Sequence, residues 1–301
     1  MRIFLTGATG FIGSHVVTEL LGSGHAVLGL TRSEAGAQSL RRQGAEPHAG
    51  DIEDLESLAR GAALCDAVIH TAFDHDFTRY VENCEKDRRV VAALGRALAG
   101  TDRPLLITSS TGMGSPTPGA LATEDQFNPG DPSPRVASEL AGEALTAEGV
   151  KVIVIRLPQV HDTVRQGLIS YLLDVARQRG VAAWVGDGAN CYSAAHVSDV
   201  ARLYRLALER GRAGARYHAV AERGVSLRVI VEILASGLGV PAAPISPESA
   251  ADHFGPMAAF AQLDLPASSA WTRAQLDWTP TGPDLITDLQ AMDYTRPGRG
   301  D

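Results

Sequence analysis

The chain has 301 residues, of which 45% are hydrophobic and 21% are charged, values close to those of ordinary globular proteins. This composition excludes a disordered, collagen-like or coiled-coil chain. The sequence contains 27 basic and 35 acidic residues, and the resulting formal charge of −8 disfavours a general nucleic-acid-binding protein.

Three widely spaced cysteines, Cys65, Cys84 and Cys191, form no CxxC pair. This pattern favours reduced thiols over a disulfide framework, and we predict no metal site because potential ligands do not cluster. Apolar runs stay shorter than the roughly 18 residues expected of a membrane span. Because the residues after Met1 have the pattern of a strand, we expect a cytoplasmic protein without a signal peptide.

The first half of the chain alternates short apolar runs with helical patterns. Strands are predicted at residues 2–6, 26–30, 66–70, 105–108 and 152–155, and helices between them include residues 80–99 and 138–147. Such alternation is typical of a parallel sheet with helices on both faces. The expected fold class is therefore α/β, a Rossmann-type doubly wound parallel sheet.

After residue 157 the strand–helix rhythm changes. Helices are predicted at residues 167–179, 196–209, 226–238 and 284–292, with proline-rich stretches between them. We therefore expect a dinucleotide-binding domain over residues 1–157 and a smaller C-terminal α/β substrate domain over residues 158–301. The boundary is approximate, and an interleaved arrangement of the two domains stays open.

A glycine-rich loop, GATGFIG, follows the first predicted strand and precedes a helical pattern. Gly7 permits a tight turn, Gly10 permits close approach of a pyrophosphate, and Gly13 permits packing of the helix on the strand. The phosphates would bind at the helix N-terminus, where N–H groups and the helix dipole favour anions. The predicted contacts of this loop are Gly7, Thr9, Gly10, Phe11, Ile12 and Gly13.

The second strand is followed by Arg32 and Ser33. A dinucleotide-binding fold that selects NAD carries an acidic residue here, whereas an arginine pairs with the 2′-phosphate of NADP. We therefore predict that NADP(H) is favoured over NAD(H). Glu34 opposes this prediction because its carboxylate would repel a phosphate, and a solvated Arg32 without a ligand is the alternative.

Taken together, these segments resemble the short-chain dehydrogenase/reductase superfamily, in its extended and atypical branches of epimerase/dehydratase-like proteins. Further segments similar to that superfamily are TAF at 71–73, ITSST at 107–111, RLP at 156–158 and GDG at 186–188 before HVSD at 196–199. The resemblance implies that Asp51 and Ile52 contact adenine, and that Thr71, Ala72 and Phe73 line the ribose. It also implies that Ser109, on the active-site serine strand, binds the cofactor and that Pro158 lies beside the nicotinamide.

The sequence departs from this superfamily at its acid–base pair, a Tyr and a Lys four residues apart. Arg135 occupies the Tyr place and Glu139 the Lys place, and the only lysines are Lys86 and Lys151. Proton transfer by a positioned side chain contributes typically 10²–10⁴-fold to a rate. A second departure is Tyr192, which stands where nucleotide-sugar enzymes carry an arginine for the diphosphate, and this disfavours a sugar-nucleotide substrate.

Three residues are candidates for the replacement chemistry. Ser110 would polarise a substrate carbonyl, with capping of the strand end as the alternative role. Tyr192 would donate a proton to an alkoxide, with a place in the pocket wall or the core as the alternative. His161 titrates near neutrality and would serve as an acid, although a surface-loop histidine is the interpretation that we favour.

These observations predict an NADP(H)-dependent oxidoreductase that reduces a small carbonyl or imine by hydride transfer. An epimerase or dehydratase, and an NADP(H)-sensing protein without turnover, are the alternatives. We expect a small-molecule substrate, neither nucleic acid nor membrane as a partner, and a homodimer through the helix at 80–99 as an implication of the resemblance.

Overall fold

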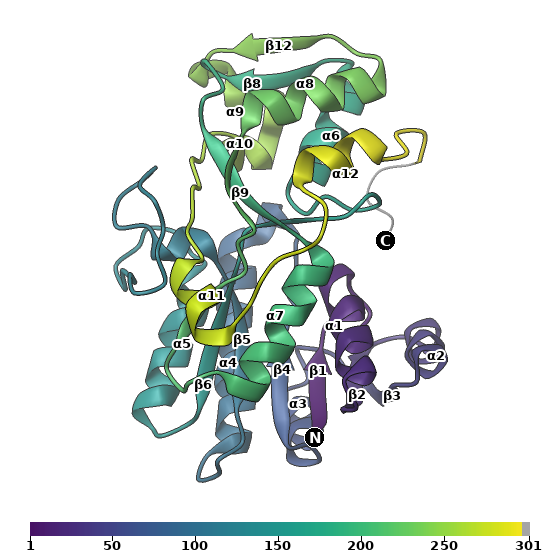
Figure 1. The fold of residues 1–301 in the computed structure, drawn as a ribbon, viewed down its shortest axis with the longest axis vertical. Coiled ribbons are helices and arrows are strands. Elements are labelled where there is room, and N and C mark those ends of the chain that lie inside the picture. The colour runs from purple at the N-terminus through teal and green to yellow at the C-terminus, as the bar shows by residue number, and fades with distance from the viewer. Residues whose placement is uncertain (297–301) are drawn as a thin grey trace.

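The structure is a computed structural model and describes residues 1–296 of the chain. Its centre is a parallel sheet in the strand order β10-β6-β5-β4-β1-β2-β3 (Figure 1). The strands are β1 (Arg2–Thr6), β2 (Ala26–Thr31), β3 (Glu46–Ala49), β4 (Ala67–His70), β5 (Leu105–Ser110), β6 (Val152–Leu157) and β10 (Arg216–His218). The central strands β1, β4, β5 and β6 are almost continuously apolar because both faces of the sheet are covered.

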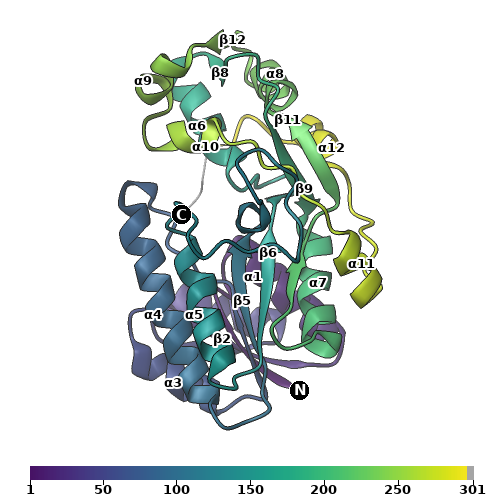
Figure 2. The same ribbon diagram turned by 90° about the vertical axis from the view of Figure 1, so that its left-hand side faces the viewer.

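Helices cover the two faces of this sheet (Figure 2). One face packs against α1 (Phe11–Gly22), α2 (Glu34–Gln43) and α7 (Val197–Arg210), and the other against α3 (Leu55–Ala63), α4 (Tyr80–Leu98) and α5 (Val136–Ala147). Val16 and Leu20 of α1 are fully buried at the spacing expected of one helical face. The sheet and its two helical layers confirm the predicted Rossmann-type α/β class.

A second core lies above the sheet in Figure 1. It contains a three-stranded sheet, β11-β9-β7, and a pair of parallel strands, β12 and β8. The strands are β7 (Gln159–His161), β8 (Ala182–Val185), β9 (Cys191–His196), β11 (Glu222–Ser226) and β12 (Ala242–Ile245). The helices of this core are α6 (Ile169–Arg179), α8 (Leu227–Leu238), α9 (Ala250–Phe254), α10 (Ala258–Ala261) and α12 (Leu285–Ala291).

The chain crosses between the two cores more than once. After β9 it returns to the first core, where α7 packs against α1 and β10 pairs with β6 through Tyr217 and Ile155. The short helix α11 (Ala270–Leu276) also contacts α7 and β10. A cut at residue 157 would therefore remove one strand and one covering helix from the main sheet.

The carboxyl ends of the parallel strands meet at the edge of the sheet that faces the second core (Figure 1). Crevices at this edge are where open α/β sheets bind ligands. Within residues 1–296, none of the helices is long and apolar enough to cross a membrane. The same part of the chain holds no group of three His, Cys, Asp or Glu side chains placed to bind a metal.

Candidate functional site

The glycine loop joins β1 to α1 through a tight turn. Gly7 has φ +70°, and a Cβ there would lie 2.7 Å from the Ala72 nitrogen. A Cβ at Gly13 would lie 2.0 Å from the Gly7 carbonyl oxygen, so only glycine permits this packing of helix on strand. Gly10 is the N-cap residue, no side chain caps α1, and its first turn contains no acidic residue. These features fit the pyrophosphate of a dinucleotide.

A hollow of about 280 Å³ opens beside this loop. One wall is formed by the loop and the first turns of α1, and the other by the segment that follows β7. Its lining residues are Thr9, Gly10, Phe11, Ser14, His15, Asp162, Val164 and Arg165. The hollow therefore lies between the first core and a loop that leads into the second.

Arg32 extends from the carboxyl end of β2 with 81% of its side chain exposed, and its Nε lies 3.7 Å from Asp51 Oδ2. The Ser33 hydroxyl caps α2 by accepting from the Gly36 nitrogen at 3.1 Å. Glu34, whose carboxylate would oppose a bound phosphate, is paired with Arg41 at 3.0 Å. Arg32 and Asp51 are thus neighbours, and Ile52, the other residue predicted to contact adenine, is half-buried.

The predicted ribose segment begins where β4 ends. The Thr71 hydroxyl donates to the Thr6 carbonyl oxygen at 2.8 Å, which ties this segment to the start of the glycine loop. The backbone of Ala72 packs directly against Gly7, and Phe73 is half-buried. The structure therefore places Thr71, Ala72 and Phe73 next to the glycine loop.

The Arg135 guanidinium lies 4.4 Å from the centre of the Phe73 ring. Its Nη1 donates to Asp87 Oδ2 at 2.6 Å and also to the Ser138 hydroxyl, and its Nη2 donates to the Thr108 carbonyl oxygen at 2.7 Å. In the sequence, Arg135 is recognised only as a departure from the superfamily's motif, and no function is predicted for it. The one feature that could have indicated a function is a cationic residue at the position predicted for a catalytic tyrosine.

Asp87 holds this arginine from the middle of α4. His70 Nε2 donates to Asp87 Oδ1 at 2.9 Å, and the Thr6 hydroxyl donates to His70 Nδ1 at 2.6 Å. Burial opposes ionisation of the Asp87 carboxyl, but Arg135 and His70 outweigh it and hold its pKa well below the usual range. A chain of buried polar contacts thus runs from the end of β1 to Arg135.

Glu139, which the sequence motifs predict to stand in the place of the superfamily's lysine, is fully buried and paired with Arg156 through two contacts of 2.8 Å. Arg216 Nε donates to the same carboxylate at 2.9 Å. Burial would raise the pKa of Glu139, but Arg156 lowers it below its usual value. This carboxylate is therefore held within the fold by Arg156 and Arg216.

Ser109, Ser110 and Thr111 stand at the carboxyl end of β5. Ser109 is buried, whereas Ser110 is half-buried and its hydroxyl accepts from the Gly112 nitrogen at 3.3 Å. That contact leaves the proton of the Ser110 hydroxyl available to a ligand. Pro158, between β6 and β7, is also half-buried at this edge. Ser110 therefore combines the predicted capping role with a free donor.

Tyr192 lies in the second core, 2% exposed, and its hydroxyl donates to the Phe260 carbonyl oxygen at 2.6 Å. Burial raises the pKa of this phenol above its usual value. Because its hydroxyl proton is hydrogen-bonded to a backbone oxygen, we assign Tyr192 a packing role. The alternative prediction, a core residue, therefore fits Tyr192 better than the prediction of a proton donor.

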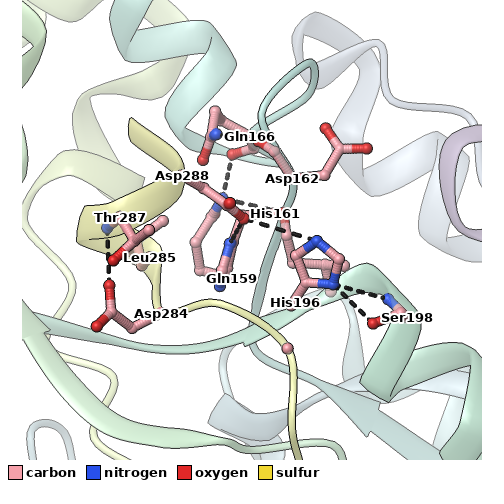
Figure 3. Close-up of polar contacts among 12 residues, drawn as sticks. Gln159, His161, Asp162, Gln166, His196, Ser198, Asp284, Leu285, Thr287 and Asp288 are labelled. Carbon is pink, nitrogen blue, oxygen red and sulfur yellow. Dashed lines mark hydrogen bonds and ion pairs between the residues drawn. The ribbon is translucent and has the colours of Figure 1, made fainter. Parts of the chain in front are cut away.

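His161 is fully buried, which corrects the expectation of a surface-loop histidine. Its Nδ1 donates to Asp288 Oδ2 of α12 at 2.7 Å, and His196 Nε2 lies 3.8 Å from the same oxygen (Figure 3). Burial lowers the pKa of His161, although Asp288 opposes this. The sequence separation of 127 residues between His161 and Asp288 hides this contact from sequence reasoning.

Comparisons with known proteins agree with this geometry. The model of the NAD dependent epimerase/dehydratase family matches residues 3–221. Uncharacterized protein C2A9.02 of Schizosaccharomyces pombe is 45% identical over 295 residues, which cover 98% of this chain and 100% of that protein. A 4-hydroxy-2-methyl-3-oxo-4-farnesyl-3,4-dihydroquinoline-1-oxide ketoreductase of Stigmatella aurantiaca is 28% identical, covering 85% of this chain and 80% of the ketoreductase.

Among solved structures, UDP-glucose 4-epimerase of Thermus thermophilus in complex with NAD superposes with a TM-score of 0.77. It is 21% identical, and the match covers 98% of this chain and 99% of that one. The resemblance drawn from the sequence motifs is thereby confirmed. With a family model that spans most of its length, this chain belongs to the NAD dependent epimerase/dehydratase family.

Proposed function

We propose that this protein is an NADP(H)-dependent reductase of a small carbonyl compound. The observation that carries the proposal is the buried, anchored guanidinium of Arg135. The sequence motifs predict that this residue stands in the place of the superfamily's tyrosine. A guanidinium is a permanent cation, which stabilises an oxyanion but accepts no proton at neutral pH. The ketoreductase relative supports the same class of reaction.

The surroundings of Arg135 fix both its charge and its place. Burial alone would lower the pKa of this guanidinium, but Asp87 raises it above its usual value. Within residues 1–296, Asp87, Ser138 and the Thr108 carbonyl take three of its five N–H groups. The other two remain for an oxygen atom of the substrate or the ribose.

The nicotinamide ring of the cofactor supplies the hydride that reduces the carbonyl carbon. As that bond forms, the π electron pair of the C=O bond moves onto oxygen. Arg135 stabilises the developing negative charge, and the Ser110 hydroxyl donates a hydrogen bond to the same oxygen. Since Tyr192 is committed to Phe260, we assign the final proton to water.

The charge of Arg135 also discriminates between substrates. A carbonyl becomes more negative at the transition state, whereas an iminium is already a cation and would be repelled. The proposal therefore narrows the sequence prediction from a carbonyl or imine to a carbonyl. A conjugated carbonyl would need less help from an acid if the hydride added to its β-carbon instead, because the product anion is then a delocalised enolate.

An epimerase or dehydratase is the second candidate, and the match to the epimerase/dehydratase family model favours it. Both of those reactions begin by oxidising an alcohol, and a group must take the hydroxyl proton. Arg135 is unsuited to that step, and Glu139 is enclosed by Arg156 and Arg216. Because neither Arg135 nor Glu139 can accept the hydroxyl proton, we favour the reductase over the epimerase or dehydratase.

The test is consumption of NADPH by the purified protein with a panel of small aldehydes, ketones and conjugated carbonyls. We expect turnover, and we expect Ser110→Ala to lower kcat about 10²-fold while NADPH affinity stays unchanged. Arg135→Lys, which keeps the charge, should retain more activity than Arg135→Met. Thermal denaturation of both variants identifies any loss caused by unfolding.

Two results would overturn the proposal. Tight NADPH binding without turnover of any carbonyl would leave a sensor of NADP(H). Interconversion of sugar nucleotides by protein that retains bound NAD would establish the epimerase or dehydratase.

A further inference from the structure

Lys86, in the second turn of α4, is one of the two lysines of the chain, and the reaction proposed for Arg135 and Ser110 does not involve it. It is only 8% exposed, and a lysine is almost never buried to this extent unless it is paired. Its Nζ donates to Asp74 Oδ2 at 3.0 Å and lies 3.5 Å from Glu53 Oε1. We propose that Lys86 is a positioning residue that joins the two loops predicted to bind the adenosine half of the cofactor. This inference rests on the proposed use of NADP(H).

The two carboxylates that Lys86 joins belong to different loops at the same edge of the sheet. Glu53 follows Ile52 in the loop after β3, which is predicted to contact adenine, and Asp74 follows Phe73 in the ribose segment after β4. In the sheet order, β1 and β2 separate β4 from β3. Backbone pairing within the sheet therefore does not join these two loops directly, whereas the Lys86 side chain contacts both of them.

The ribose segment is held on α4 at two points, one turn of the helix apart. Lys86 binds the Asp74 carboxylate, and Asn83, which is 1% exposed, donates from Nδ2 to the Asp76 carbonyl oxygen at 3.0 Å. The Asp76 nitrogen in turn donates to Asp74 Oδ1 at 3.1 Å. The position of Asp74 is thus fixed by its own loop and by Lys86, so a ligand that binds this segment finds it already ordered.

The charge of Lys86 also balances the acids of the two loops. The hydrogen bond to Asp74 raises the pKa of Lys86 above its usual value, so the ammonium is charged at neutral pH. Without this charge, the carboxylates of Asp74 and Glu53 would lie uncompensated beside a ligand whose phosphates are also negative. Loss of Lys86 should therefore both loosen the two loops and repel the adenosine half of the cofactor.

Binding measurements with three probes test the inference: NADPH, 2′-AMP, which contains only the adenosine half, and reduced nicotinamide mononucleotide, which contains only the other half. We expect Lys86→Met to weaken NADPH and 2′-AMP about tenfold, the loss of one charge-assisted contact, and to leave the mononucleotide within twofold. Lys86→Arg, which keeps the charge, should recover part of the loss.

Lys151→Met is the matched control, because Lys151 pairs with Asp102 at 2.8 Å before β6, at the opposite edge of the sheet. It should leave all three affinities unchanged. Asp74→Asn removes the same contact from the partner's side, where the side chain is 35% exposed, and should weaken 2′-AMP selectively as well. This variant decides the question if thermal denaturation shows that Lys86→Met does not fold.

The possible failures are distinguishable. Unchanged affinity of Lys86→Met and Asp74→Asn for NADPH and 2′-AMP would overturn this inference and leave the proposed function standing. Equal weakening of 2′-AMP and the mononucleotide would also overturn it, because Lys86 would then act through the fold as a whole. Failure of the wild-type protein to bind either NADPH or NADH would overturn the proposed function itself, and this inference with it.

Discussion

The guanidinium of Arg156 and the carboxylate of Glu139 form a bidentate ion pair in which both side chains are 0% exposed. The Nε–Oε1 and Nη2–Oε2 distances are each 2.8 Å. This pair joins β6 to α5 at the position that the sequence motifs predict to correspond to the superfamily's lysine. The reversal of charge at residue 139 therefore has a structural counterpart in Arg156.

Glu139→Gln should destabilise the protein strongly. The substitution leaves the Arg156 guanidinium buried without its counter-charge, and breaking a buried pair in this way costs about 3–5 kcal/mol. The free energy of unfolding from urea denaturation measures the loss. Glu82→Gln is the control, since Glu82 pairs with Arg79 on the exposed surface of α4 and its loss should leave the urea midpoint unchanged. Similar midpoints for the two variants would contradict the structural role of Glu139.

His218 should make stability depend on pH. It is fully buried at the end of β10, where Nδ1 donates to the Ser268 carbonyl oxygen at 2.8 Å and Arg156 donates to Nε2 at 3.3 Å. Burial, assisted by the Arg156 charge, lowers its pKa to about 3. The unfolded chain, with a pKa near 6.5, therefore takes up this proton more readily than the folded chain.

The sign follows from this difference. The contribution of neutral His218 is complete above pH 6.5 and declines as the pH falls towards 3, by about 1.4 kcal/mol per pH unit. The wild type should thus lose about 2 kcal/mol more than His218→Asn between pH 7 and pH 5. Urea denaturation at the two pH values measures this difference. Parallel losses in the two proteins would show that His218 has the same pKa in the folded and the unfolded chain.

Much of the fold follows from local patterns in the sequence. The apolar run at 152–155 predicts a buried parallel strand, and the glycines at 7, 10 and 13 predict the turn, the helix start and the packing that the structure contains. Each of these signals depends on neighbours along the chain. The geometry of the cofactor loop is therefore predictable from its sequence alone.

Contacts between distant segments are not predictable in this way. His161 is paired with Asp288 on the last described helix, and the Tyr192 hydroxyl donates a hydrogen bond to the Phe260 carbonyl oxygen. Arg135 is held in place by an ion pair with Asp87, which lies 48 residues earlier in the chain. In each case the sequence supplies a residue of suitable chemistry, whereas burial and partner depend on tertiary packing.

Arg32 should set the preference for NADP(H). Its guanidinium is largely exposed at the end of β2, and the pairing of Glu34 with Arg41 neutralises the carboxylate that would oppose a 2′-phosphate. We expect NADPH to bind at least tenfold more tightly than NADH, a difference of about 1.4 kcal/mol. Arg32→Ala should abolish this preference by weakening NADPH alone, because NADH has no phosphate for the arginine to bind.

Direct titration of both cofactors into the wild type, Arg32→Ala and Arg42→Ala measures the effect. Arg42 is an exposed arginine of α2, so its variant controls for a general loss of surface charge. A preference lost in Arg32→Ala and kept in Arg42→Ala would assign the phosphate to Arg32. Equal binding of NADPH and NADH by the wild type would remove Arg32 from the site. An enzyme indifferent to the 2′-phosphate would then bind the cofactor chiefly through the glycine loop.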